Sequence, residues 1–283
     1  MSTGAATPGT VAPGTVAPGT ATPGAVPDQV RPHPVGQWWT LTARGVSGLV
    51  RSGEIIFAFI SPAFLAICFY LPLRTIMDQY PGMDYAQYLM PIIALQSVGF
   101  VASSAAVRSS LDRTKGINTR FRSLPMPAVV PPLARLSANV TLLVISLICA
   151  TVASLVIGWR PQGGVVGTIA LYTVALVVGS LIALIADAIG TVAAGPESTS
   201  QILGLPILIL GMLSTGVVPA ERFPDWIAPF VRNQPISQFA DAMRAFNDGT
   251  ATAGVVLPTL WWCLGLGAVA AVLLVPAQRR LGR

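Results

Sequence analysis

The stretch Leu205–Phe246, LPILILGMLSTGVVPAERFPDWIAPFVRNQPISQFADAMRAF, decides how this chain is organised. It begins as an aliphatic run, turns at Gly216–Pro219, and continues as a short amphipathic segment with a tryptophan, several prolines and interleaved charges. A second helix-like segment, Ser237 to Asn247, closes it, and another apolar run follows at once. Backbone at a membrane interface must satisfy its own hydrogen bonds or stay shallow. We therefore expect an amphipathic insert between two membrane helices, on one side of the bilayer.

The composition is that of a membrane protein. Of 283 residues, 53% are hydrophobic and 10% are charged, and the mean hydropathy is +0.69. A soluble domain carries about 25% charged residues. The net charge of +6 is dispersed beside apolar runs, which is typical of membrane topology and not of a nucleic-acid-binding face. The sequence predicts one all-α integral membrane domain over residues 36–283.

Residue types needed for catalysis or metal binding are scarce. The only histidine is His33, and the only lysine, Lys115, precedes a glycine instead of the Ser or Thr of a phosphate-binding GxxxxGK[ST] loop. The cysteines Cys68, Cys149 and Cys263 lie in apolar runs without a CxxC pattern, so we expect buried hydrophobes. The chain is expected to hold no catalytic residue, metal or nucleotide of its own.

Residues 1–35 are a low-complexity segment in which Pro-Gly recurs every five residues. Such a segment has little to bury and cannot offset its ordering entropy. It also lacks the charged and apolar regions of a signal peptide. We expect a disordered cytoplasmic tail, with a partner-binding arm as the alternative.

Residues 37–52 show the periodicity of an amphipathic helix. Trp38 and Trp39 fall in one apolar arc, whereas Arg44 and Arg51 fall on the opposite side. Indoles in the headgroup layer and arginines toward water are typical of an interfacial helix. An apolar run follows directly, which disfavours an ordinary surface helix of a soluble domain.

Six apolar runs are each near the roughly 20 residues needed to cross a bilayer. The first is expected to be broken by Pro62 and Pro72. The predicted spans are about 54–76, 85–107, 133–157, 165–189, 199–218 and 255–276.

The basic residues predict the orientation of these spans. With both termini inside, twelve of the 17 Arg and Lys residues lie on the cytoplasmic side. We therefore expect a multi-pass plasma-membrane protein with both termini cytoplasmic and the insert outside. Four tryptophans then lie near outer span ends, where aromatic belts occur: Trp159, Trp226, Trp261 and Trp262.

Two acidic residues, Glu54 and Asp187, lie at the ends of apolar runs. Such residues can be relay groups of a proton-coupled transporter. Near an interface the cost of a charge is small, so a structural role is favoured. No run carries a charge at its midpoint, which argues against an ion-coupled carrier.

The connection between the second and third runs, RSSLDRTKGINTRFRSLPMPAVVPPLAR, is the longest on the cytoplasmic side. A loop that only links two helices could be much shorter. We expect a short helix that lies along the membrane and docks into a cytoplasmic partner or lipid headgroups. A bare solvated loop is the alternative. The residues expected to make the contact are basic or apolar: Arg113, Arg120, Phe121, Arg122, Leu124 and Met126.

Together, these features resemble the permease subunits of type-2 ABC exporters, and most closely the daunorubicin-resistance (DrrB-like) permeases of actinobacteria. The resemblance covers about residues 37–280. In most type-2 permeases the insert holds an Asn-Pro pair, whereas here Gln234 separates Asn233 from Pro235, as in the DrrB-like subset. The matching strings are GVVP (216–219), FPDWI (223–227), PFVRNQPISQF (229–239), AMR (242–244) and RFRSLPMP (120–127).

The resemblance implies a set of partners and a substrate class. It implies two permease domains, from this chain twice or from a sister subunit, and two separate cytoplasmic subunits that bind ATP and Mg. The interfacial helix and the inner loop are expected to contact that ATPase, and membrane lipids surround the permease. Expected substrates are amphiphiles, either anthracycline-like antibiotics or polyketide-derived envelope lipids. The alternative function is a non-transporting membrane scaffold or lipid-binding membrane protein.

The insert is expected to cap the outer end of the export path. Ser237 can cap the helix that follows, and Asp241 and Arg244 can pair on its wet face. An amphiphilic cargo is expected to meet aromatic side chains here; the alternative is that these only anchor the insert to lipid. The residues expected to form this gate are Pro219, Trp226, Phe230, Asn233, Pro235, Phe239 and Arg244.

Overall fold

The structure is a computed structural model that describes residues 4, 33–77, 84–117, 120, 126–127, 129–193 and 195–281. Every regular element among these residues is helical. The predicted tail lies outside the described residues except for Gly4 and positions 33–35. The helices are α1 (Pro34–Arg51), α2 (Glu54–Met77), α3 (Tyr85–Thr114), α5 (Val130–Ile157), α6 (Gly164–Val192), α7 (Pro196–Met212), the 3-10 turn η1 (Ala220–Arg222), α8 (Ala228–Asn233), α9 (Pro235–Asn247) and α10 (Ala253–Leu281).

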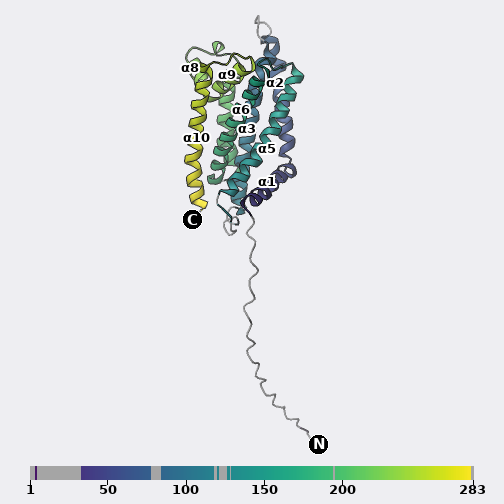
Figure 1. Cartoon of the computed structure of the whole chain (residues 1–283), viewed down its shortest axis with the longest axis vertical. Helices are drawn as coiled ribbons and strands as arrows, with labels where there is room; N and C mark the ends of the chain where they lie inside the picture. Colours follow the sequence, from purple (N-terminus) through teal and green to yellow (C-terminus); the bar gives the residue numbers. More distant parts are fainter. Residues whose placement is uncertain are drawn as a thin grey trace. The chain divides into compact units, whose positions relative to one another are not determined.

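Helix α3 is the centre of the bundle formed by α1 to α10. It packs against α2, α5, α6, α7 and α9, and it is buried along most of its length. Many of its buried positions hold Ala, Ser or Gly, which let neighbouring helix backbones approach closely. Figure 1 shows α1 at one end of this bundle and α8 and α9 at the other. We call these the α1 end and the α9 end.

In the part of the chain that the structure describes, five helices are long and apolar enough to cross a membrane: α2, α3, α5, α6 and α10. The outward faces of α2 and α10 carry large exposed apolar side chains, which suit lipid and would favour aggregation in water. Examples are Ile56, Phe57, Phe59, Phe64, Trp261 and Leu264. The all-helical, membrane-spanning class predicted from composition is confirmed.

Two local predictions are wrong. Helix α2 continues through Pro62 and Pro72 without a break. A proline removes one backbone donor, and a membrane helix tolerates this because neighbouring groups can satisfy the freed carbonyl. Trp159 is fully buried in the core and is therefore not part of an exposed aromatic belt.

Helix α7 ends at Met212, whereas the sequence predicts a span that reaches Val218. The chain turns over residues 213–217, where Ser, Thr and Gly replace the aliphatic run. The turn packs directly on α3: a Cβ atom added at Gly216 would lie 2.6 Å from Cδ1 of Ile92. A side chain at position 216 would have to displace Ile92, so glycine allows the turn to lie close to α3.

The contact between α3 and α6 depends on Gly190. A Cβ atom there would lie 2.2 Å from the backbone oxygen of Ala106. We expect Gly190→Ala to lower the free energy of unfolding by about 1–3 kcal/mol through overpacking, measured as a lower Tm in detergent. Gly204→Ala on α7 is the control, because its Cβ meets nothing within 4 Å. Unchanged Tm values for both variants would contradict the close helix contact.

Candidate functional sites at the two ends of the bundle

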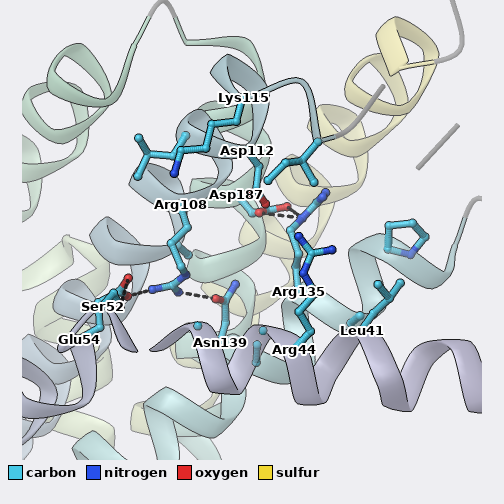
Figure 2. A pocket seen from close by; sticks show the side chains of 18 residues that line it. Leu41, Arg44, Ser52, Glu54, Arg108, Asp112, Lys115, Arg135, Asn139 and Asp187 are labelled. Carbon is cyan, nitrogen blue, oxygen red and sulfur yellow. Dashed lines mark hydrogen bonds and ion pairs between the residues drawn. The ribbon is translucent and has the colours of Figure 1, made fainter. Parts of the chain in front are cut away.

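An ionic cluster lies at the α1 end (Figure 2). Glu54, the first residue of α2, pairs with Arg108 of α3. The same guanidinium donates to Oγ of Ser104 at 2.9 Å and to Oδ1 of Asn139 on α5 at 2.7 Å. The Ser104 hydroxyl also hydrogen-bonds the Glu54 carboxylate. Arg108 thus ties together α2, α3 and α5.

A second ion pair joins α5 to α6 beside the first. Nε of Arg135 lies 3.1 Å from the carboxylate of Asp187, whose side chain is only 6% exposed. Glu54 and Asp187, the two acidic residues at the ends of apolar runs, therefore each have a guanidinium partner. Removing one member of such a pair leaves a partly buried charge without compensation, which is strongly destabilising. The ion pairs give Glu54 and Asp187 a structural role, which is the role that the sequence favours over proton relay.

A cavity of about 320 Å³ lies against the cluster. Its walls come from α1, α2, α3, α5 and α6, and Arg44 of α1 and Asp112 and Lys115 near the end of α3 add further charges (Figure 2). Among the described residues, no group of three His, Cys, Asp or Glu side chains could hold a metal ion. The lining can bind a charged or polar group.

Helix α1 lies against α5, and its apolar arc is split between two environments. Leu49 is buried and Nε1 of Trp38 donates to Oγ of Ser137 at 3.1 Å. Trp39 is 65% exposed. Arg51 is exposed, and Arg44 is exposed while also lining the cavity. The amphipathic helix exists as predicted, and its indoles have different roles.

At the α9 end, side chains bind the backbone groups that the end of α7 leaves without helical partners. Nε2 of Gln234 donates to the carbonyl of Leu210 at 3.1 Å and also to that of Leu213. The backbone N–H of Thr215 donates to Oγ of Ser237 at 3.0 Å. The prediction that Ser237 caps α9 is wrong: the helix begins at Pro235, and Ser237 serves the turn after α7.

Arg244 of α9 binds two further carbonyls of this turn and one carbonyl of α3. Its Nη2 donates to the carbonyls of Thr215 at 2.8 Å and Gly216 at 3.0 Å, and its Nε donates to the carbonyl of Tyr88 at 3.2 Å. The guanidinium also lies 3.7 Å from the centre of the Tyr88 ring, and the Tyr88 hydroxyl donates to the Thr215 carbonyl. Arg244 thereby joins α9, α3 and the turn after α7.

The predicted pair of Asp241 and Arg244 is present, with Nη1 of Arg244 2.7 Å from Oδ1 of Asp241. Its placement on a wet face is wrong for Arg244, whose side chain is 14% exposed. Burial raises the pKa of the Asp241 carboxyl, although Arg244 and the Thr215 hydroxyl act in the opposite direction. Because the folded pKa is raised, this carboxyl stabilises the fold most at acidic pH, and that contribution is lost as pH rises.

The aromatic residues of the predicted gate differ in how far they are exposed. Phe239 is 1% exposed and packs in the core with Met243, whereas Trp226 and Phe230 are 80% and 51% exposed. Pro219 precedes η1, Pro235 begins α9, and Nδ2 of Asn233 donates to the carbonyl of Pro229.

The residues predicted to contact an ATPase are partly described. Arg113, near the end of α3, donates to the carbonyl of Ala193 just before α7. Arg120 is exposed and Met126 is half-buried. The other three predicted contacts lie outside the described residues: Phe121, Arg122 and Leu124.

Sequence reasoning missed the partners in both clusters, which include Tyr88, Arg108, Asn139 and Gln234. From the sequence, Arg108 and Arg135 contribute only to the count of cytoplasmic basic residues that predicts the orientation. One available indication is that an acidic residue at the end of an apolar run usually pairs within the bundle.

Comparison with known proteins gives one consistent result. The family described as ABC-2 family transporter protein matches residues 69–275. The doxorubicin resistance ABC transporter permease protein DrrB of Mycobacterium tuberculosis is 35% identical over 253 residues, covering 83% of this chain and 86% of that protein. The daunorubicin resistance ABC transporter permease protein DrrB1 of Streptomyces coeruleorubidus is 30% identical over 206 residues, covering 71% and 69%. The probable doxorubicin resistance ABC transporter permease protein DrrC of Mycobacterium tuberculosis is 28% identical over 194 residues, covering 68% and 69%.

The Arg108–Glu54 pair can be tested by removing one partner and then both. Arg108→Met should lower the free energy of unfolding by about 3–5 kcal/mol, because it leaves Glu54 as an uncompensated charge. Arg108→Met with Glu54→Leu should recover most of that loss, which thermal unfolding in detergent would report. The control is Arg232→Met, which breaks the exposed pair with Glu221 and should change stability by less than about 1 kcal/mol. A double variant no more stable than Arg108→Met would contradict the pairing.

Proposed function

Because the chain belongs to the ABC-2 family of transporter membrane proteins and is thus a permease subunit of an ABC transporter, we propose that it exports amphiphilic compounds from the cell. ATP hydrolysis takes place in a separate subunit, and the chain itself is not an enzyme. The candidate cargoes are anthracycline-like antibiotics and polyketide-derived envelope lipids. The observation that carries this substrate class is the similarity to permeases named for doxorubicin and daunorubicin resistance.

We propose that α7 is the sixth span. At 17 residues it extends about 25 Å, somewhat less than the roughly 30 Å of hydrocarbon. Its two ends support a crossing, because they contact opposite ends of α3. Arg113 donates to the carbonyl of Ala193 just before α7, and Tyr88 donates to that of Thr215 just after it. The α1 end then faces the cytoplasm and the α9 end faces outward.

The proposed outer gate consists of the α8–α9 insert. Its exposed aromatic side chains, Trp226 and Phe230, offer an apolar surface that an amphiphile can contact without a charged site. Phe239 holds α9 against the core, so contact between cargo and Phe239 would require α9 to move. The insert therefore combines an anchor, built on Phe239 and Arg244, with an exposed apolar rim.

The ATPase subunit is proposed to dock at the α1 end. The contact residues proposed there are Arg113, Arg120, Phe121, Arg122, Leu124 and Met126, together with α1. The ion pair of Arg108 with Glu54 lies close to this surface and links α3 to α2, so a displacement of the loop after α3 would reach α2. A second permease, another copy or a sister subunit, is proposed to complete the path.

The docking role can be tested at Phe121. Phe121→Ala should reduce co-purification of the ATPase with the permease, or uncouple hydrolysis from export, because it removes the apolar anchor of the loop. Pull-down from membranes measures association, ATPase activity of the recovered complex measures hydrolysis, and drug efflux from intact cells measures export. Phe57→Ala is the control, since it makes the same change on the exposed outward face of α2, outside the residues proposed for either site. Wild-type association, hydrolysis and export in Phe121→Ala would reject the docking role.

The orientation can be tested with single cysteines in a variant lacking Cys68, Cys149 and Cys263. In intact cells an impermeant thiol reagent should label cysteines at Gln162 and Glu221, which are exposed at the α9 end. A cysteine at Thr114, exposed at the end of α3, should be labelled only after lysis. The reverse pattern would overturn the topology.

The gate can be tested by comparing exposed and buried aromatic residues. Trp226→Ala should change the export rate or substrate range at normal protein level, because the indole contributes to a surface and not to the core. Phe239→Ala should lower protein level, with a loss of about 3–5 kcal/mol for a buried Phe. If Trp226→Ala leaves export per molecule unchanged, the gate role is wrong and the insert is only a structural lid.

A further inference from the structure

We propose that the cavity at the α1 end binds the phosphate headgroup of an anionic membrane phospholipid. Seven charged residues line the cavity, four basic and three acidic, which leaves an excess of one positive charge. They are Arg44, Arg108, Lys115, Arg135, Glu54, Asp112 and Asp187.

The two ion pairs in the lining carry no net charge, so the positive excess comes from the other lining residues. The pairs of Arg108 with Glu54 and of Arg135 with Asp187 each contribute one positive and one negative charge. The remaining lining charges are Arg44 and Lys115, which are exposed, and Asp112. Figure 2 shows Arg44 on α1 and Lys115 just after the end of α3, so basic side chains come from two parts of the chain. A singly charged phosphodiester would balance this excess.

The size and lining of the cavity suit a headgroup with its chains attached. A water molecule occupies about 30 Å³ of liquid, so about 320 Å³ accommodates a phosphate and a glycerol unit. Beside the charged groups the walls hold the apolar side chains of Leu41, Ile117 and Pro131. This mixture matches the junction between a headgroup and its acyl chains better than it matches a free ion.

The cavity is at the depth where headgroups lie if α1 is an interfacial helix. Exposed Trp39 and the polar remainder of α1 are typical of a helix in the headgroup layer. This step rests on the proposed placement of α1 at the membrane surface. It does not depend on export, so the lipid site and the proposed function can fail separately.

Native mass spectrometry of the purified chain tests the proposal. After delipidation, phosphatidylglycerol or phosphatidylcholine is added, and the fraction of protein with lipid bound is measured. The wild type should retain phosphatidylglycerol in preference to phosphatidylcholine. Arg44→Gln and Lys115→Gln should each weaken that retention about fivefold, the value of one basic residue near an anionic lipid surface. Arg44→Lys and Lys115→Arg keep the charge and should retain the lipid.

The control is Arg232→Gln, which removes an exposed positive charge at the α9 end and should behave as wild type. Glycerol 1-phosphate, added as a competitor, separates a lipid site from a phosphate site. It carries the phosphate without acyl chains and should displace the lipid only weakly. Equal retention in all variants, or displacement by glycerol 1-phosphate as effective as by phosphatidylglycerol, would overturn the assignment.

Discussion

In an apolar environment every backbone N–H and C=O needs a hydrogen-bond partner, and the end of α7 is where this chain meets that constraint with side chains. Within a helix the backbone satisfies itself, but the turn after Met212 frees several carbonyls. Arg244, Gln234 and Tyr88 bind them, and Ser237 accepts the N–H of Thr215. The partners come from α3 and from the segment that follows the turn, so the turn and α9 depend on each other.

Because the turn and α9 depend on each other, polar side chains of the insert face inward, whereas the sequence predicts that they face water. Arg244 and Ser237, which look suited to a solvated face or a helix cap, are directed inward because the turn requires donors and acceptors there. Phe239 and Met243 pack beside them, and the exposed side is left to Trp226. The apolar rim proposed to meet cargo is therefore held by a polar network beneath it.

At the α1 end, too, buried polar groups need partners, but here the groups are charged side chains instead of backbone carbonyls. Glu54 is tolerated in a partly buried position and Asp187 in a buried one because Arg108 and Arg135 compensate their charges. The pairs cross-link four helices close to the proposed docking surface for the ATPase. A positive excess in the adjoining cavity is the basis for the lipid site inferred above.

The sequence predicts local structure but not the contacts between residues that lie far apart along the chain. The apolar runs located α2, α3, α5, α6 and α10 because hydropathy over some twenty residues is a local property. The same periodicity reasoning identified α1 and the pairing of Asp241 with Arg244, three residues apart.

Partners far apart in sequence were missed: Arg135 and Asp187 are 52 residues apart, and Arg244 and Tyr88 are 156 apart. Which face of a helix meets which neighbour decides such contacts, and periodicity does not specify it. For the same reason Trp159 was expected in an aromatic belt although it is buried in the core.

The central claim is that this chain forms the path by which a partner ATPase expels an amphiphile. The most direct measurement is ATP-dependent accumulation of doxorubicin in inside-out vesicles that contain the chain and its ATPase. The account predicts accumulation that requires both proteins and stops when the ATPase cannot hydrolyse ATP. Because doxorubicin represents one of the two candidate cargo classes, the same assay is run with an envelope lipid. ATP-independent distribution of both compounds, equal with and without this chain, would contradict the account.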